Sequence, residues 1–326
     1  MQCALNTNQD KDLTSINQMN AKFVSTLWAR NGSVRKSTVM GFAAAAALTL
    51  LGASSSQASV IDLGAAGGYS ILTYNSSNVS DSAFQGGPIG VVNGNWTQSG
   101  GGQTNTQQAT TVFLSPGHTN GGPSVETTVF DAAKLNASWS AATALSSTLA
   151  ALAPTDTLGA ISSGGTISKS TVGTYVLSIS SINLNQSALT LSAPAGSTFV
   201  LNISGNVTLN GGSAGNGILL AGGLTSSNVI YNLTGANSNI TTSGGGNAQQ
   251  IFGTVLATGA NASVNLHPGA VLGEVIATTF TSSSGALVSV PPMTSVPEPS
   301  SFLPLVGVLG MVVGGSTIRR RLAAAA

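Results

Sequence analysis

Short apolar runs separated by Gly-, Asn- and Ser-rich stretches dominate the middle of this chain. Residues 199–203, 228–233 and 252–257 are such runs, each five or six residues long, and their length and β-branched content predict strands. The stretches between them carry residues that favour tight turns. Because the runs recur in order, the pattern favours a β-rich fold over low-complexity disorder.

Two of these runs return later in the chain. Residues 199–205 align with residues 229–235 at an offset of 30, and residues 253–258 align with residues 273–278 at an offset of 20. Periods of this length are typical of stacked coils. We therefore predict a mainly β fold, a right- or left-handed β-helix or solenoid. A 20-residue step would be one coil with three short faces, and a 30-residue step a coil with a longer turn.

Stacking also predicts which side chains are buried. Equivalent residues lie about 4.8 Å apart on neighbouring coils, and successive side chains point to opposite faces. Val255 above Val275 would fill the interior, whereas Leu256 above Ile276 would point outward and need cover. We expect residues 61–72 to pair near one end of the stack.

Residues 130–153 contain no glycine and could form an element that covers these outward apolar residues. Asp131 is suited to a helix start, and Pro154 to a helix stop. Between them runs an apolar stripe at helical spacing, which Ser146 interrupts. The stripe consists of Leu135, Trp139, Ala142, Leu149 and Leu152. We predict one long helix of about 20 residues alongside the solenoid, with Trp139 packed against it.

Both ends of the chain have the pattern of targeting segments. Near the N-terminus, Arg35 and Lys36 precede an apolar run at residues 39–53, and small residues follow, as in a secretory signal peptide. We predict that residues 1–58 are a signal peptide with a signal helix and a long n-region, cleaved after Ala58.

The C-terminal end has three ordered parts. Residues 291–301 are a linker with a Pro-Glu-Pro motif, residues 302–318 are an apolar run, and residues 319–326 begin with three arginines. As a transmembrane helix, the apolar run would be roughly 25 Å long, close to the ~30 Å of a bilayer core. The arginines favour a cytoplasmic position for the basic tail. The sorting motif is Val296, Pro297, Glu298 and Pro299, and the membrane-orienting residues are Arg319, Arg320 and Arg321.

This tail resembles the PEP-CTERM sorting signal of Gram-negative bacteria. The resemblance implies that secretion machinery exports the protein and that the tail holds it in the inner membrane. An exosortase-type enzyme would then process the chain near the motif. The resemblance also implies a final location at the cell surface or in the extracellular matrix.

The charge of the remaining chain restricts its partners. Residues 59–290 are the predicted solenoid domain. Residues 59–295 carry two lysines, no arginine and six carboxylates, so their formal charge is −4, whereas the whole chain is +1. This surface lacks the basic patch that binds phosphate backbones, which argues against nucleic acid as a partner. The single cysteine, Cys3, lies in the leader, so we expect no disulfide and no cysteine-ligated metal in the mature domain.

Groups suited to catalysis are sparse. Ser213 lies in a Gly-x-Ser-x-Gly pattern, but a turn and not a helix follows it, so we interpret it as part of a solenoid corner. His118 and His267 each adjoin a Pro-Gly turn, and their spacing suggests no third ligand or acid partner. Glu126 and Asp131 suit a helix start better than a glycosidase pair. We therefore predict that the protein is not an enzyme and has no cofactor or metal.

The predicted domain resembles two kinds of known protein. A solenoid with one long helix alongside, together with the opening residues 61–69, resembles the choice-of-anchor A domain of bacterial surface proteins. The architecture is also similar to the β-helix of ice-binding proteins. The first resemblance implies an adhesin that contacts exopolysaccharide or a neighbouring cell surface, in a biofilm matrix for example.

Ice binding through a flat β-helix face is the alternative function, and hydrolysis is a distant third. A flat face of Thr, Ser and Ala could order water in an ice-like lattice. We find no regular Thr-x-Thr ladder at the coil spacing in the sequence. That absence favours adhesion over ice binding.

Overall fold

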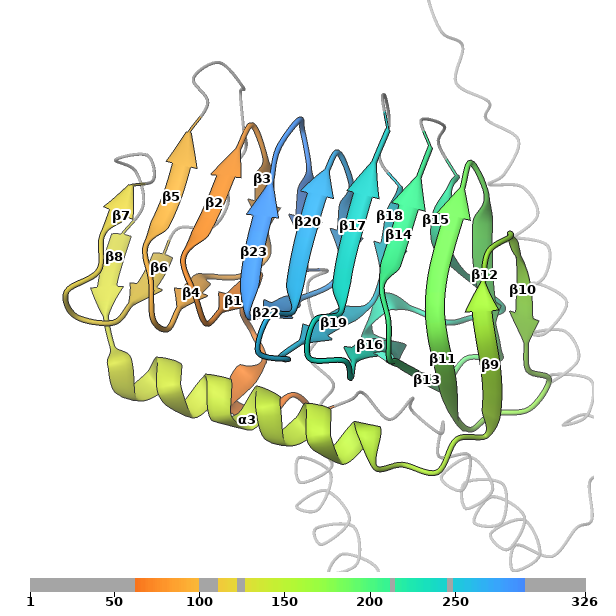
Figure 1. Cartoon of the computed structure of the whole chain (residues 1–326). Helices are drawn as coiled ribbons and strands as arrows, with labels where there is room; N and C mark the ends of the chain where they lie inside the picture. The colour runs from red at the N-terminus through yellow and green to blue at the C-terminus, as the bar shows by residue number, and fades with distance from the viewer. Residues whose placement is uncertain (1–61, 100–110, 122–126, 212–214, 245–248, 291–326) are drawn as a thin grey trace, which may run out of the picture. The chain divides into compact units, whose positions relative to one another are not determined.

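The chain winds into a three-sided β-solenoid with one helix along its side (Figure 1). The computed structural model describes residues 62–99, 111–121, 127–211, 215–244 and 249–290. Strands of neighbouring coils pair in parallel. One 17-stranded sheet bends into two faces, and a 7-stranded sheet forms the third. The predicted β-solenoid class is therefore confirmed.

Face A is the side that the helix covers. Its strands, in stacking order, are β8 (Thr127–Phe130), β6 (Thr111–Leu114), β4 (Ile89–Val91), β1 (Ile71–Thr73), β22 (Val275–Ala277), β19 (Thr254–Ala257), β16 (Val229–Leu233), β13 (Thr198–Ile203), the first half of β11 (Thr174–Asn185) and β9 (Asp156–Ile161).

Faces B and C complete each coil. The strands of face B, in stacking order, are β7 (Asn120–Gly121), β5 (Trp96–Ser99), β2 (Ser77–Ser80), β23 (Thr279–Ser282), β20 (Ser263–His267), β17 (Asn239–Ser243), β14 (Val207–Asn210) and the second half of β11. The strands of face C are β3 (Ala83–Gln85), β24 (Leu287–Ser289), β21 (Ala270–Leu272), β18 (Gln250–Phe252), β15 (Gly217–Ala221), β12 (Ala188–Ser192) and β10 (Gly165–Ser168).

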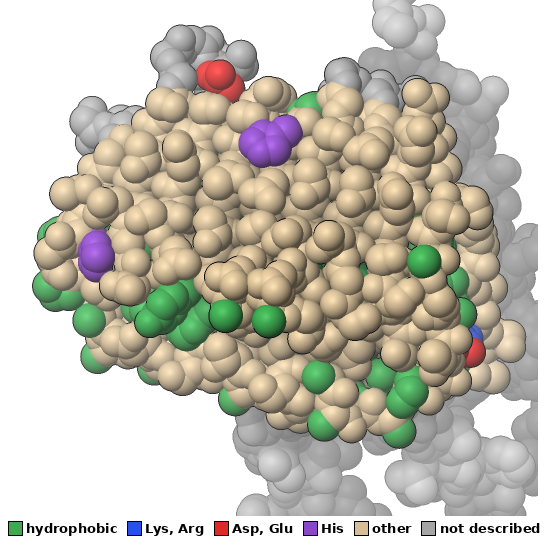
Figure 2. Space-filling view, in the orientation of Figure 1, with side chains coloured by type: hydrophobic (Ala, Val, Ile, Leu, Met, Phe, Trp, Pro, Cys, Tyr) green, Lys and Arg blue, Asp and Glu red, His purple; other side chains and the backbone are tan. Residues whose placement is uncertain are grey.

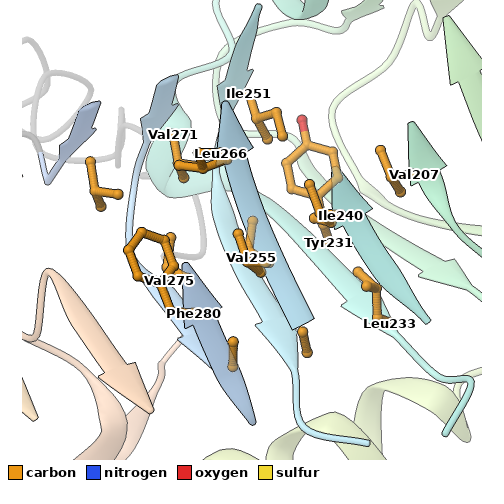
Figure 3. Close-up of a cluster of buried hydrophobic side chains, with 14 of the residues drawn as sticks. Val207, Tyr231, Leu233, Ile240, Ile251, Val255, Leu266, Val271, Val275 and Phe280 are labelled. Carbon is orange, nitrogen blue, oxygen red and sulfur yellow. The ribbon is translucent and has the colours of Figure 1, made fainter. Parts of the chain in front are cut away.

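The predicted stacking of repeats is confirmed. Val255 pairs with Val275, and Leu256 pairs with Ile276 on the next coil. The two valines belong to the apolar interior (Figure 3), whereas the leucine and isoleucine belong to a second buried cluster outside the coils. The 30-residue repeat pairs β13 with β16 in the predicted register. The extra residues of this longer coil lie at its corners, where the short 3-10 helix η2 (Ser226–Asn228) also lies.

Helix α3 (Ala132–Ala150) covers the outward side of face A. Its start is capped by Asp131, whose Oδ1 accepts a hydrogen bond of 2.9 Å from the backbone N–H of Lys134, an interaction of about 1 kcal/mol. Leu135 is fully buried and reaches the sheet where Gly90 leaves room, because a Cβ there would lie 3.0 Å from its Cδ2. Burial of each such leucine contributes roughly 2 kcal/mol.

The stripe on the helix differs from the prediction at Ser146 and Leu152, whereas Trp139 packs against the solenoid as predicted. Ser146 is buried and does not interrupt the stripe, because its Oγ donates to Asn232 Oδ1 at 2.6 Å. Trp139 is half-buried and stacks beside Tyr74, with ring centroids 5.3 Å apart. Leu152 lies beyond the end of the helix and is exposed.

The chain does not pass through the stack in sequence order. Strand β1 pairs with β4 on one side and with β22, from the last coil, on the other. The expectation that residues 61–72 pair near one end is therefore wrong, since they enter in the middle of the stack. The first strands build outward to β8, and α3 then leads to β9 at the other end, from which the remaining coils return (Figure 1).

The predicted targeting segments lie outside the described residues. These segments are residues 1–58, 291–301, 302–318 and 319–326, and they include Ala58, the Val296–Pro299 motif and Arg319, Arg320 and Arg321. In the described part of the chain, no helix is both long and apolar enough to cross a membrane. The predicted signal peptide, sorting motif and transmembrane segment therefore stay predictions.

Candidate functional site

Face B is a flat sheet face that no element of the described chain covers, whereas face A packs beneath α3. Alternate side chains of its strands fill the interior, such as Val207, Ile240, Val264 and Phe280. The intervening residues point outward, as the period of two in a strand requires. The outward residues therefore form rows that run along the stack.

A central row of threonines and asparagines runs along face B. Each member is the register partner of the next on a neighbouring strand. In order the central row is Asn183, Thr208, Thr241, Asn265, Thr281, Asn78 and Thr97. Because paired strands lie about 4.8 Å apart, the row repeats an amide or a hydroxyl at that interval.

Two flanking rows are also polar and consist mostly of asparagine, serine and threonine. One contains Asn239, Ser263 and Thr279, and the other contains Asn185, Asn210, Ser243 and His267. Neighbours along the rows are hydrogen-bonded, which holds their side chains in place. Ser263 Oγ donates to Asn239 Oδ1 at 2.8 Å, and Ser243 Oγ donates to Asn210 Oδ1 at 2.5 Å. In the central row, Thr281 Oγ1 donates to Asn265 Oδ1 at 2.5 Å.

Face B is uncharged. None of its strands, as far as the structure describes them, contains Asp, Glu, Lys or Arg. Figure 2 shows this face from the front, where uncharged polar side chains and backbone dominate and the apolar side chains lie mostly in the lower half, the largest patch being toward the left. An uncharged, regularly spaced array of donors and acceptors is suited to a flat, repetitive, hydroxyl-rich surface more than to a single small ligand.

The central row is not the regular Thr-x-Thr ladder that would favour ice binding, because asparagines stand between its threonines. Stacked members of the central row are separated by irregular intervals along the chain, because the corners between faces differ in length. From Asn265 the row continues to Thr281 and then to Asn78, which lies near the other end of the sequence. No fixed spacing in the sequence could have identified it.

The candidate catalytic residues do not come together. His267 Nδ1 shares a hydrogen bond of 2.5 Å with Ser283 Oγ at the rim of face B, and His118 lies in the loop before β7. Asp131 caps α3 as predicted. Ser213 and Glu126 lie outside the described residues. Among the described residues, no three His, Cys, Asp or Glu side chains are grouped as metal ligands would be.

Fold and face together define a class: a β-solenoid with one uncovered polar sheet face. A match to a known family agrees with this class. Residues 47–288 match the family described as an ice-binding-like adhesive domain, and the chain belongs to that family. A comparison with curated proteins finds no match.

Several solved structures are similar to this chain. An ice-binding protein from the Antarctic ascomycete Antarctomyces psychrotrophicus is 20% identical, with a TM-score of 0.48 over 71% of this chain and 98% of its own. An ice-binding protein from an Arctic yeast, LeIBP, is 21% identical, with a TM-score of 0.49 over 73% of this chain and 96% of its own. The DUF3494 domain of a Shewanella frigidimarina ice-binding protein is 17% identical, with a TM-score of 0.48 over 70% of this chain and 96% of its own.

Proposed function

We propose that this protein is an exported, non-enzymatic adhesin that binds a neutral, hydroxyl-rich surface through face B. The central row carries the proposal, because its amides and hydroxyls repeat along the stack without any charge. An exopolysaccharide or the surface of a neighbouring cell offers matching hydroxyls. Many weak contacts along one rigid face would add up, as they do in multivalent binding.

We also propose the route by which the protein reaches this ligand. Secretion machinery would remove residues 1–58, and the apolar run at residues 302–318 would hold the chain in the inner membrane. An exosortase-type enzyme would recognise the Pro-Glu-Pro motif of a PEP-CTERM tail. Replacement of Pro297 and Glu298 by alanine should then leave unprocessed chain in the inner membrane, and normal processing of that variant would refute this route.

Ice is the second candidate ligand. The central row favours it, because four of its members, Thr97, Thr208, Thr241 and Thr281, pair a methyl with a hydroxyl at strand spacing. Against it, three of the seven members of the row, Asn78, Asn183 and Asn265, are asparagines, which are more strongly hydrated than threonines. Adhesion and ice binding would use the same face, so only direct measurement separates them.

One matched pair of variants tests whether face B binds. Thr241→Asp places a charge in the central row, and Thr190→Asp places the same charge at a half-buried outward position in the middle of a face C strand. We expect Thr241→Asp to weaken retention on neutral exopolysaccharide at least about tenfold, or ~1.4 kcal/mol, and Thr190→Asp to leave it unchanged.

The same two variants separate the candidate ligands. Thermal hysteresis lost in Thr241→Asp and kept in Thr190→Asp would establish ice as the ligand. Equal effects of both variants on exopolysaccharide retention and on hysteresis would refute face B as the binding surface. Circular dichroism of each variant checks that the solenoid is intact.

A further inference from the structure

The chain enters and leaves the solenoid at one corner. The Ser70 N–H donates to the carbonyl of Pro88 at 2.9 Å, and the Ser70 carbonyl accepts from the N–H of Val275 at 3.1 Å. The Val290 N–H donates to the carbonyl of Gln85 at 2.9 Å. Residues at both ends of the described domain thus contact the end of β3 or the turn that leads from it to β4. We call this corner between faces C and A the ridge.

The ridge contains the break in an otherwise continuous stack. Strand β24 ends at the corner where strand β1 begins, so in an uninterrupted solenoid Val290 would lead directly into Ile71. The four face A strands β1, β4, β6 and β8 lie on one side of the break, and the six from β22 to β9 lie on the other. Both ends of the domain therefore emerge from within the stack.

A buried contact holds the incoming chain at the ridge. Gly68 donates its backbone N–H to Glu274 Oε1 at 2.9 Å, and the Glu274 side chain is only 4% exposed. Just before it, the short 3-10 helix η1 (Gly64–Ala66) packs against α3, where Ser138 Oγ donates to the Ala65 carbonyl at 2.7 Å. The segment that precedes β1 is thus fixed between α3 and the last coil.

The outgoing chain is also firmly held. Strand β24 pairs with β21 on one side and with β3 on the other, so it is an interior strand of face C and not a free edge. Tension applied beyond Val290 would have to separate two ladders of backbone hydrogen bonds, whereas an edge strand is held by one. The ridge is therefore a suitable point of attachment for a domain under load.

The ridge lies opposite face B. In a three-sided coil, the corner between faces A and C is the one that face B does not share. Figure 1 shows the strands of face B toward the viewer, with α3 running below them along most of the stack. The exit of the chain and the rows of face B are thus on opposite sides of the solenoid.

We propose that the chain following Val290 tethers the domain at the ridge, so that face B points away from the surface that carries the protein. This orientation rests on the proposed function of face B. It also explains why the break lies in the middle of the stack, since a central tether would keep the whole length of face B parallel to the carrying surface. The partner of the ridge is the producing cell's own surface, and the partner of face B is the opposing one.

Site-specific labelling on intact cells tests this orientation without any ligand. In a full-length Cys3→Ser background, which removes the native thiol, one variant carries Asn78→Cys in the central row and a second carries Ala65→Cys beside the ridge. Both native side chains are exposed. Each variant reacts with a bulky, membrane-impermeant maleimide on intact cells and again after mild detergent has released the chain. The readout for each variant is the labelling rate on intact cells divided by the labelling rate after release.

We expect the ratio to be near one for Asn78→Cys and several-fold lower for Ala65→Cys, since the carrying surface would shield the ridge. A lower ratio at Asn78→Cys, or equal ratios at both positions, would overturn the proposal. Failure of the proposed function would be seen separately, as unchanged exopolysaccharide retention in the Thr241→Asp variant. The two ideas can therefore fail independently.

Discussion

Glu274 makes the stability of the domain depend on pH in a direction opposite to that of most carboxylates. It lies at the ridge with its Oε1 bonded to the Gly68 N–H, and its Oε2 has no hydrogen-bond partner among the described residues. Burial disfavours the charged form and raises the pKa of Glu274 from 4.5 to about 7, although the Gly68 hydrogen bond opposes the shift.

The direction in which the free energy of unfolding changes with pH follows from the number of protons that Glu274 binds in the folded and unfolded chains. Below pH 4.5 the carboxyl is protonated in both folded and unfolded chains, and stability is at its maximum for this group. As pH rises toward 7, the unfolded chain releases the proton while the folded chain keeps it, so the free energy of unfolding falls. At about 1.4 kcal/mol per pKa unit, the loss is about 3 kcal/mol, and it is complete above pH 7.

Glu274→Gln should remove this dependence. The amide can still accept from Gly68, and it never ionises. At pH 8 the variant of the mature domain should be more stable than the wild type by up to about 3 kcal/mol. This corresponds to a melting temperature roughly 6–12 °C higher. At pH 4 the two should be nearly equal.

The measurement is urea unfolding of residues 59–290 between pH 4 and pH 8, followed by fluorescence of the buried Trp96. A wild-type profile whose dependence on pH matches that of Glu274→Gln would refute the reasoning. A variant less stable than the wild type at pH 8 would refute it as well, because the Gln amide nitrogen would then cost more than the buried charge.

Three further predictions concern packing and charge. Asn232→Ala should lower the free energy of unfolding by about 3 kcal/mol, as measured by urea, because it leaves the buried hydrogen-bond partners of Asn232 unpaired. Gly273→Ala should destabilise the domain far more than Gly165→Ala in thermal melts, since a Cβ would lie 2.1 Å from a backbone oxygen at the first site and meets nothing within 4 Å at the second. The hydrogen bond from Lys169 lowers the pKa of Asp156; NMR titration should find this pKa below its ordinary value, and Lys169→Met should raise it.

The interior of the solenoid could be predicted from the sequence because it depends on local periodicity. Alternation along one strand separates Val255 from Leu256, and an offset of 20 residues pairs each with its partner on the next coil. The need to cover outward apolar residues then led to the helix. These inferences require no contact between distant parts of the chain beyond a single coil.

Two features depended on contacts that no local pattern encodes. Ile71 pairs with Val275, so the first strand enters beside one of the last, and nothing in either segment specifies the other. The polarity of Ser146 alone predicted an interruption in the apolar stripe of the helix. In the structure, Asn232 of the sheet lies opposite Ser146 and forms a hydrogen bond with it. Buried polar pairs of this kind are recognised only once both members are placed.

Asparagine has two different roles in this fold, and together they explain why face B is suited to binding. Beneath α3, Asn202 donates to the Leu149 carbonyl at 2.7 Å and Asn232 donates to the Ser146 carbonyl at 2.9 Å, which ties the last turns of the helix to the sheet. On face B, Asn265 accepts from a neighbouring threonine and fixes both side chains. Side chains that are already ordered lose little entropy on contact with a ligand. A rigid stack with fixed polar rows can therefore bind a repetitive surface through contacts that would each be too weak alone.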